Sequence, residues 1–134
     1  MKVDIKKMKF LFFKLSNIYI LKILPQMYII LPVPPRILEF HKDHKLREGS
    51  RLTLTCVITE GDLPLKFLWT KDGIPQNNQP HVEIKNWDEF NSHLVISHVM
   101  KHHAGNYTCK ASNAAASAIG TAALYVNGKR VKIG

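Results

Sequence analysis

The feature that most constrains this chain is the placement of its two cysteines on short segments of alternating apolar and polar residues. One face of segment 51–59 is apolar and consists of Leu52, Leu54, Cys56 and Ile58. The segment around Cys109 alternates in the same way, with Tyr107 and Ala111 on the face of the cysteine. A period of two predicts β-strands, so both cysteines face a core from separate strands. Two cysteines by themselves leave a disulfide, buried free thiols and half of a metal site open.

Further segments show the same period and are separated by turn residues. The inward positions before the turn Lys71-Asp72-Gly73 are Leu65, Phe67 and Trp69, and later ones are Leu94, Ile96, Ala122, Leu124 and Val126. Asp-Gly favours a hairpin turn because glycine accepts a positive φ. Residues 37–40 are expected to begin an edge strand, which Leu46 continues after a kink. Seven or eight short strands without a helical period predict that residues 32–126 form an all-β, two-sheet antiparallel sandwich.

Four residues are spaced as in immunoglobulin domains, namely Cys56, Trp69, Tyr107 and Cys109. The cysteines are 53 residues apart, and Trp69 follows the first of them by 13 residues. The resemblance implies a Cys56–Cys109 disulfide between the sheets, with Trp69 packed on it. It also implies that the Tyr107 hydroxyl bonds to upstream backbone, in a core that includes Leu54, Leu94 and Ile96. Closing a loop of this length stabilises a fold by roughly 4 kcal/mol. The bridge needs an oxidising compartment, which predicts a location outside the cell or in the secretory lumen.

Two longer runs narrow the resemblance to a group of adhesion proteins. They read Leu94-x-Ile96-x-x-Val99 and Gly105-x-Tyr107-x-Cys109-x-Ala111-x-Asn113, and they resemble the intermediate-set domains of cell-adhesion molecules. Within that set, the chain is similar to arthropod Down syndrome cell adhesion molecules (Dscam) in Pro34-Pro35-x-Ile37-x-x-Phe40, Gly61-Asp62-Leu63-Pro64-Leu65 and Gly105-Asn106-Tyr107-Thr108-Cys109. One position departs from the pattern. His103 stands where the family usually has an aspartate that pairs with a basic residue, so that ion pair is not expected here.

The first 31 residues differ in composition from the rest of the chain. Of these residues, 26 are Phe, Ile, Leu, Lys, Met, Asn or Tyr, and none is Gly or Ala. Lys14 and Lys22 interrupt the apolar run, and no small-residue cleavage site follows it. Three interpretations stay open: a degenerate signal or signal-anchor, a membrane-surface or disordered segment, and translated intron, since these residue types have A/T-rich codons. The tail 127–134 has the same possible origin.

Several residues were considered as functional sites. Asn106-Tyr107-Thr108 is the chain's only N-glycosylation sequon, and Asn106 should point outward if Tyr107 points inward. Trp87 lies in a polar stretch, where packing as a lid over the core competes with exposure as a contact residue. The histidines near 41–44 and 98–103 are expected to be exposed turn residues, because zinc needs three or four ligands in fixed geometry. No spacing of a catalytic triad or a phosphate-binding loop is present, so we expect no enzyme, metal site or cofactor.

The function follows from the class of domain. The net charge of +9 is scattered among acids within the domain, which favours a solvated surface over nucleic-acid binding. The resemblance implies a protein-recognition module on the extracellular side of a cell-surface adhesion receptor, neuronal or immune, with other immunoglobulin-like domains as partners. The membrane would be reached only through the parent protein or residues 1–31. Two alternatives stay open, namely a secreted single-domain binding protein and a structural spacer of a larger protein.

Overall fold

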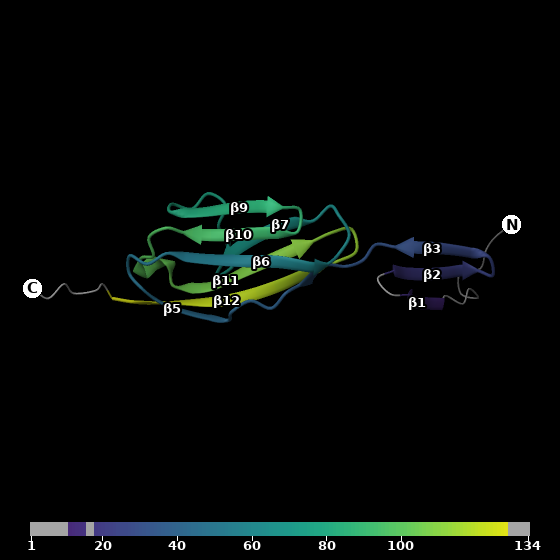
Figure 1. The fold of residues 1–134 in the computed structure, drawn as a ribbon, viewed down its shortest axis with the longest axis horizontal. Coiled ribbons are helices and arrows are strands. Elements are labelled where there is room, and N and C mark those ends of the chain that lie inside the picture. Colours follow the sequence, from purple (N-terminus) through teal and green to yellow (C-terminus); the bar gives the residue numbers. More distant parts are fainter. Residues whose placement is uncertain (1–10, 16–17, 129–134) are drawn as a thin grey trace, which may run out of the picture. The chain divides into compact units, whose positions relative to one another are not determined.

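A computed structural model describes residues 11–15 and 18–128 of the chain (Figure 1). The chain divides into two compact units, Met1–Val33 and Pro34–Gly134. Each unit is built from strands, and the division falls close to the change in composition at Pro32. The two units are therefore taken separately below.

The described residues of the first unit form a three-stranded antiparallel sheet. Its strands are β1 (Leu11–Leu15), β2 (Ile18–Leu24) and β3 (Met27–Leu31), in the order β1-β2-β3. The two lysines that interrupt the apolar run stand opposite tyrosines on the neighbouring strands, Lys14 opposite Tyr19 and Lys22 opposite Tyr28. Each ammonium group lies over the ring of its partner, at 5.2 and 5.7 Å from the centroid, which is a cation–π arrangement. The tyrosine rings therefore provide favourable contacts for the two lysine charges that interrupt the apolar segment.

Strands in this first unit are not predicted by the sequence pattern. Within the described residues, no helix is both long and apolar enough to cross a membrane. Whether residues 1–31 are a degenerate signal or anchor, a membrane-surface or disordered segment, or translated intron stays a prediction. The origin of the tail also stays a prediction, and its residues 129–134 lie outside the described part.

The second unit is a sandwich of two sheets, as the alternating pattern predicts. One sheet has the order β4-β6-β10-β9, with β4 (Arg36–Ile37), β6 (Leu52–Glu60), β10 (Asn91–Ile96) and β9 (Val82–Asp88). The other has the order β5-β12-β11-β7-β8, with β5 (Asp43–Arg47), β12 (Ser117–Asn127), β11 (Gly105–Ser112), β7 (Lys66–Lys71) and β8 (Ile74–Pro75). A 3-10 helix, η2 (Lys101–His103), precedes β11. Strands β9, β10 and β6 run side by side in Figure 1.

The N-terminal edge of the sandwich differs from the expectation. Residues 37–46 do not form one kinked strand: β4 pairs with β6, whereas β5 crosses to the other sheet and pairs in parallel with β12. Two contacts hold the crossing. The Ala123 N–H donates to the Lys42 carbonyl at 2.7 Å. The Phe40 ring reaches into the core and lies 6.4 Å from the Trp69 ring. Alternation shows which residues face inward, but both sheets share that inner space, so the sheet change was not visible in the pattern.

Gly120 makes room for this crossing. It stands opposite Cys109 on β12, and a Cβ atom built on it would lie 2.5 Å from the Phe40 ring. Real Cβ atoms do not approach that closely. Because Gly120 has no side chain, the Phe40 ring fits beside it at the point where the chain crosses from one sheet to the other.

Candidate recognition surface

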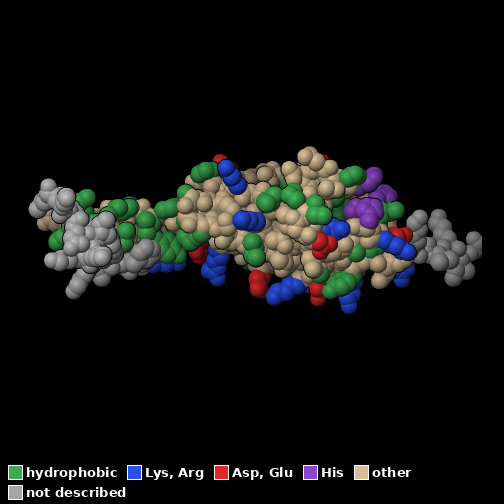
Figure 2. Space-filling model, turned by 180° about the vertical axis from the view of Figure 1, so that it is seen from behind, with side chains coloured by type: hydrophobic (Ala, Val, Ile, Leu, Met, Phe, Trp, Pro, Cys, Tyr) green, Lys and Arg blue, Asp and Glu red, His purple; other side chains and the backbone are tan. Residues whose placement is uncertain are grey.

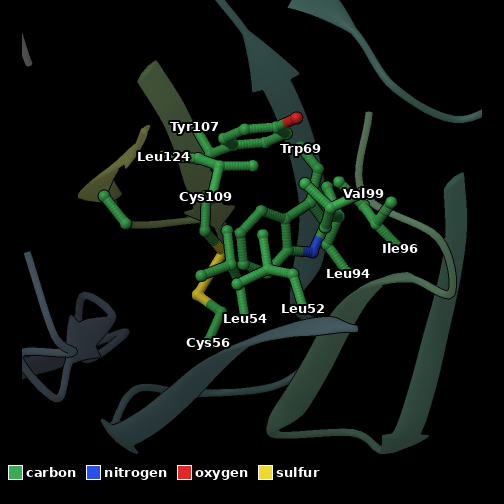
Figure 3. Close-up of a cluster of buried hydrophobic side chains, with 11 residues drawn as sticks. Leu52, Leu54, Cys56, Trp69, Leu94, Ile96, Val99, Tyr107, Cys109 and Leu124 are labelled. Atoms are coloured by element: carbon green, nitrogen blue, oxygen red, sulfur yellow. A yellow bond between two sulfur atoms is a disulfide. The ribbon is translucent and has the colours of Figure 1, made fainter. Parts of the chain in front are cut away.

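The centre of the sandwich is the disulfide and the tryptophan beside it. Cys56 and Cys109 are bonded, with their Cα atoms 6.4 Å apart, and both are fully buried. Figure 3 shows the Trp69 indole beside the bridge, with Leu52 and Leu54 across the core. Leu94 and Ile96 of β10 complete the inner surface of their sheet. The predicted core residues thus lie together, and the pairing implied by the immunoglobulin spacing is present.

A buried serine was missed in the sequence. Ser92 is fully buried opposite Cys56 on β10, and its hydroxyl accepts a hydrogen bond of 2.9 Å from the Trp69 Nε1–H. Without that acceptor the indole N–H would be a buried donor with no hydrogen bond, which destabilises the fold. The alternation could have revealed it, since Ser92 lies two residues before Leu94 and therefore on the same, inward face of the strand. A polar residue at an inward position is not recognised by a search for alternating apolar residues.

Tyr107 and His103 close one end of the core. The Tyr107 hydroxyl donates a hydrogen bond of 2.6 Å to the His103 carbonyl, which is the upstream backbone bond expected of a tyrosine at this position. Burial raises the pKa of Tyr107 far above its ordinary value, and the nearby Asp72 carboxylate acts in the same direction. The phenol is therefore a fixed neutral donor.

His103 corrects the expectation that the histidines of segment 98–103 are exposed. Its side chain is only 3% exposed, and its Nδ1 accepts a hydrogen bond of 2.8 Å from the Met100 N–H. The proton of the neutral ring is thus on Nε2, which is buried and has no hydrogen-bond partner among the described residues. Figure 2 shows histidine side chains gathered at one end of the domain.

The surroundings of His103 keep the ring neutral. Burial lowers its pKa most, and the positive charges of His102, His81 and Lys71 lower it further. Only the carbonyl of Pro80 acts in the opposite direction. The Lys71 ammonium group is itself engaged, since it donates to the His102 carbonyl at 2.8 Å. Lys71 also forms an ion pair with the neighbouring Asp72 at 4.0 Å, and the neutral His103 ring supplies no carboxylate in place of the family's aspartate.

The remaining histidines form no metal site. Across the described residues, no group of three or more His, Cys, Asp or Glu is arranged to hold an ion. His41 and His44 contact each other with ring centroids 5.9 Å apart, and His44 Nε2 lies 3.1 Å from the His41 carbonyl oxygen.

Charge is distributed evenly over the domain. Basic residues lie beside acids, as in Arg36–Glu60 at 3.6 Å and Lys85–Glu83 at 3.1 Å. On the face shown in Figure 2, Lys and Arg side chains are separated from one another, and acids lie between several of them. Paired charges of this kind are typical of a solvated surface, and the absence of nucleic-acid binding stays a prediction.

Trp87 is the most prominent apolar side chain on the second unit. It is 78% exposed, so the interpretation that it packs as a lid over the core is wrong. It lies on the outward side of β9, which is the edge strand of its sheet. Its ring meets the His93 ring edge-on at 5.7 Å, and the His93 Nδ1 is 3.0 Å from the Thr55 hydroxyl. We refer to Trp87, His93 and Thr55 as the Trp87 patch.

A turn immediately after Trp87 fixes the position of the patch. The Asp88 carboxylate accepts hydrogen bonds from the Phe90 N–H at 2.7 Å and from the Asn91 side-chain amide at 2.8 Å. The same bonds, that from Phe90 first, hold the pKa of Asp88 below its ordinary value. An exposed indole on a strand that ends in a hydrogen-bonded turn loses little freedom on binding, and exposed tryptophan is typical of contact residues at protein interfaces.

The comparison with known proteins identifies the family. The family model "Immunoglobulin domain" matches residues 34–113. The chain belongs to the immunoglobulin domain family. Among curated proteins, this immunoglobulin domain is 39% identical over 94 residues to the cell adhesion molecule Dscam2 of Drosophila melanogaster, which covers 70% of the chain and 4% of that protein. It is 41% identical over 90 residues to the human cell adhesion molecule DSCAM, which covers 67% of the chain and 4% of that protein. The chain thus spans only a small part of these relatives.

Solved structures agree with this assignment. The immunoglobulin domain is 30% identical to the Dscam1 Ig7 domain, isoform 5, with a TM-score of 0.66 over 70% of this chain and 97% of that one. It is 28% identical to a chain of the titin M10–obscurin-like 1 complex, with a TM-score of 0.64 over 73% and 98% of the two chains. The family and its adhesion relatives are of a non-enzymatic kind, in agreement with the absence of catalytic motifs in the sequence.

Proposed function

We propose that this immunoglobulin domain is an extracellular recognition module of a cell-surface adhesion receptor, and that it pairs with other immunoglobulin-like domains, a second copy of itself included. The observation that carries the proposal is the Trp87 patch, an aromatic side chain held in the open on an edge strand. The relatives named as cell adhesion molecules support the same class of function.

The disulfide supports the extracellular location. A bridge that holds both sheets together persists only in an oxidising compartment, so the domain would fold in the secretory lumen and act outside the cell. In the described part of the chain, the cysteines are both in this bridge and neither is left as a reactive thiol.

Self-association of the secreted chain tests the proposal. The full chain, placed behind a heterologous signal peptide, is purified and studied by sedimentation equilibrium and by aggregation of coated beads. Trp87→Ala should weaken pairing roughly thirtyfold, which corresponds to about 2 kcal/mol for an interfacial anchor residue. Leu68→Ala is the matched control, since Leu68 is also exposed but lies on the other sheet.

Two results would contradict the proposal. Equal self-association of wild type and Trp87→Ala would exclude the Trp87 patch as the contact. Monomeric wild-type protein at all concentrations, together with no binding to the immunoglobulin domains of the relatives, would exclude pairing between immunoglobulin-like domains.

A structural spacer is the second candidate function, because the titin chain is about as similar in fold as the Dscam1 domain. A spacer needs no partner on its outer faces. It would therefore tolerate Trp87→Ala in every assay, which separates it from the first proposal.

A further inference from the structure

Asn106 lies on the outer face of the sheet that does not carry Trp87. Tyr107, the next residue, is fully buried, and the Asn106 side chain points to the opposite side and is exposed. Its neighbour on β12 is Ala123, one of the smallest side chains available. The surface beside Asn106 is therefore open.

The backbone of Asn106 is fixed, whereas its side chain is free. The Asn106 N–H donates to the Asp72 carboxylate at 2.9 Å, and the Asp72 N–H donates to the Asn106 carbonyl at 2.8 Å. The side-chain amide makes no hydrogen bond within the described part of the chain. An exposed amide without a structural task can be substituted without any loss to the fold.

A depression in the surface lies beside Asn106. Its volume is about 400 Å³, which falls in the range of small-ligand sites. It is lined by Lys42, Asp43, Asn106, Thr121, Ala122 and Ala123. The hydroxyl of Thr121 and the charged groups of Lys42 and Asp43 offer both donors and acceptors to sugar hydroxyls.

We infer that Asn106 carries an N-linked glycan whose first sugar lies in this depression. The sequon Asn106-Tyr107-Thr108 supplies the acceptor, and the compartment that oxidises the disulfide is the one in which sequons are modified. The inference rests on the proposed extracellular function, since a chain that never enters the secretory lumen is not glycosylated.

The chemistry is a transfer from a lipid pyrophosphate-linked oligosaccharide. A bond forms between Asn106 Nδ2 and C1 of the first sugar, and the bond between C1 and the pyrophosphate oxygen breaks. The pyrophosphate leaves with that electron pair, and the amide loses one proton to the transferase or to solvent. Because Asn106 is paired within the folded sheet, the transfer precedes the folding of β11.

The glycan would decide which face of the domain is available to partners. Sugars at Asn106 would cover the outer side of β11 and β12 near β5, where Asp43 stands opposite Ala123. The outer face of the sheet with Trp87 would stay uncovered. Pairing would then be confined to that side of the domain.

The test uses the full chain, secreted from insect cells behind a heterologous signal peptide. Treatment with peptide N-glycosidase should shift the band by the mass of one oligosaccharide, and mass spectrometry should find Asn106 converted to aspartate. Asn106→Gln and Thr108→Val should abolish the shift, whereas Thr108→Ser should keep it. The glycan on the native protein should be removed more slowly than on the denatured protein, since its first sugar is packed.

A matched control separates this inference from the proposed function. Asn106→Gln combined with Pro80→Thr moves the sequon to Asn78, an exposed loop residue. If Asn78 is modified in the control and Asn106 is not modified in the secreted wild type, the glycan inference is wrong and the extracellular function stands. If neither is modified and the cysteines are free thiols, the extracellular function fails and the glycan inference fails with it. Equal removal rates from native and denatured protein would overturn the packing of the first sugar.

Discussion

Mild acid should destabilise this domain through a single buried histidine. His103 is neutral in the folded state, because burial and three neighbouring positive charges lower its pKa below the ordinary 6.5. In the unfolded chain the same ring takes up a proton as the pH falls through about 6.5. Between these two pKa values the unfolded state holds the extra proton, so the stability falls as the pH falls. The contribution of His103 is fully present above pH 6.5 and is lost on the way down to the folded pKa.

The size of the effect follows from one proton. The free energy of unfolding should fall by up to about 1.4 kcal/mol for each pH unit in this window. For a domain of this size, each kcal/mol lowers Tm by about 4–8 °C. Guanidinium unfolding followed by tryptophan fluorescence from pH 7.5 to pH 5 would measure the slope.

Two substitutions at this position make the measurement specific. His103→Asn keeps an acceptor oxygen close to the place of Nδ1, so the Met100 N–H stays bonded while the titrating ring is lost. The acid dependence should become weaker by the contribution of one proton. His103→Asp places a carboxylate near Lys71, and it should likewise lose the acid dependence that the neutral His103 ring contributes.

His102→Asn is the control, because His102 adjoins the site but is exposed. His102→Asn should leave most of the pH dependence of the free energy of unfolding unchanged. If His103→Asn unfolds with the same pH dependence as the wild type, the neutral buried state of His103 is refuted. The difference in slope between each variant and the wild type is the quantity that decides.

Three further perturbations test the core. Reduction of the single disulfide should unfold the domain at 37 °C, since the bridge contributes roughly 4 kcal/mol; an intact near-ultraviolet circular dichroism spectrum in excess reductant would contradict this. Ser92→Ala should cost about 1–3 kcal/mol in chemical unfolding, because the Trp69 N–H loses its acceptor, whereas exposed Ser97→Ala should be neutral. Gly120→Ala should cost about 1–3 kcal/mol by overpacking, with Gly128→Ala as the control in open space; equal thermal stability of these two variants would rule out the close approach.

The sandwich could be predicted because its information is local. In a strand buried on one side, inward-facing side chains recur at every second residue. The alternation around Cys56, Trp69 and Cys109 therefore showed that all three face the core. Alternate apolar positions such as Leu94 and Ile96 indicated the core face in the same way. The spacing of the cysteines and the tryptophan then fixed the family, because few folds place these residues on opposing sheets.

Other features depended on which segments meet. His103 looked like its exposed neighbour His102, and only the packing of η2 against the end of the core buried it. Trp87 looked like a residue that would cover the core, but β9 is an edge strand and presents it outward. Ser92 read as polar, and only the position of the indole N–H explains why it is buried.

The sequence by itself determined that this chain contains a disulfide-bonded immunoglobulin sandwich, since periodicity and residue spacing are properties of the chain alone. Only the tertiary structure decided where Phe40 carries the chain from one sheet to the other, and which face holds Asn106 and which Trp87. The physical reason is that an alternating strand specifies its inward and outward sides, whereas its neighbours are chosen by contacts between residues far apart in the chain. The surfaces that carry Asn106 and Trp87 therefore depend on which strands become neighbours in the folded domain.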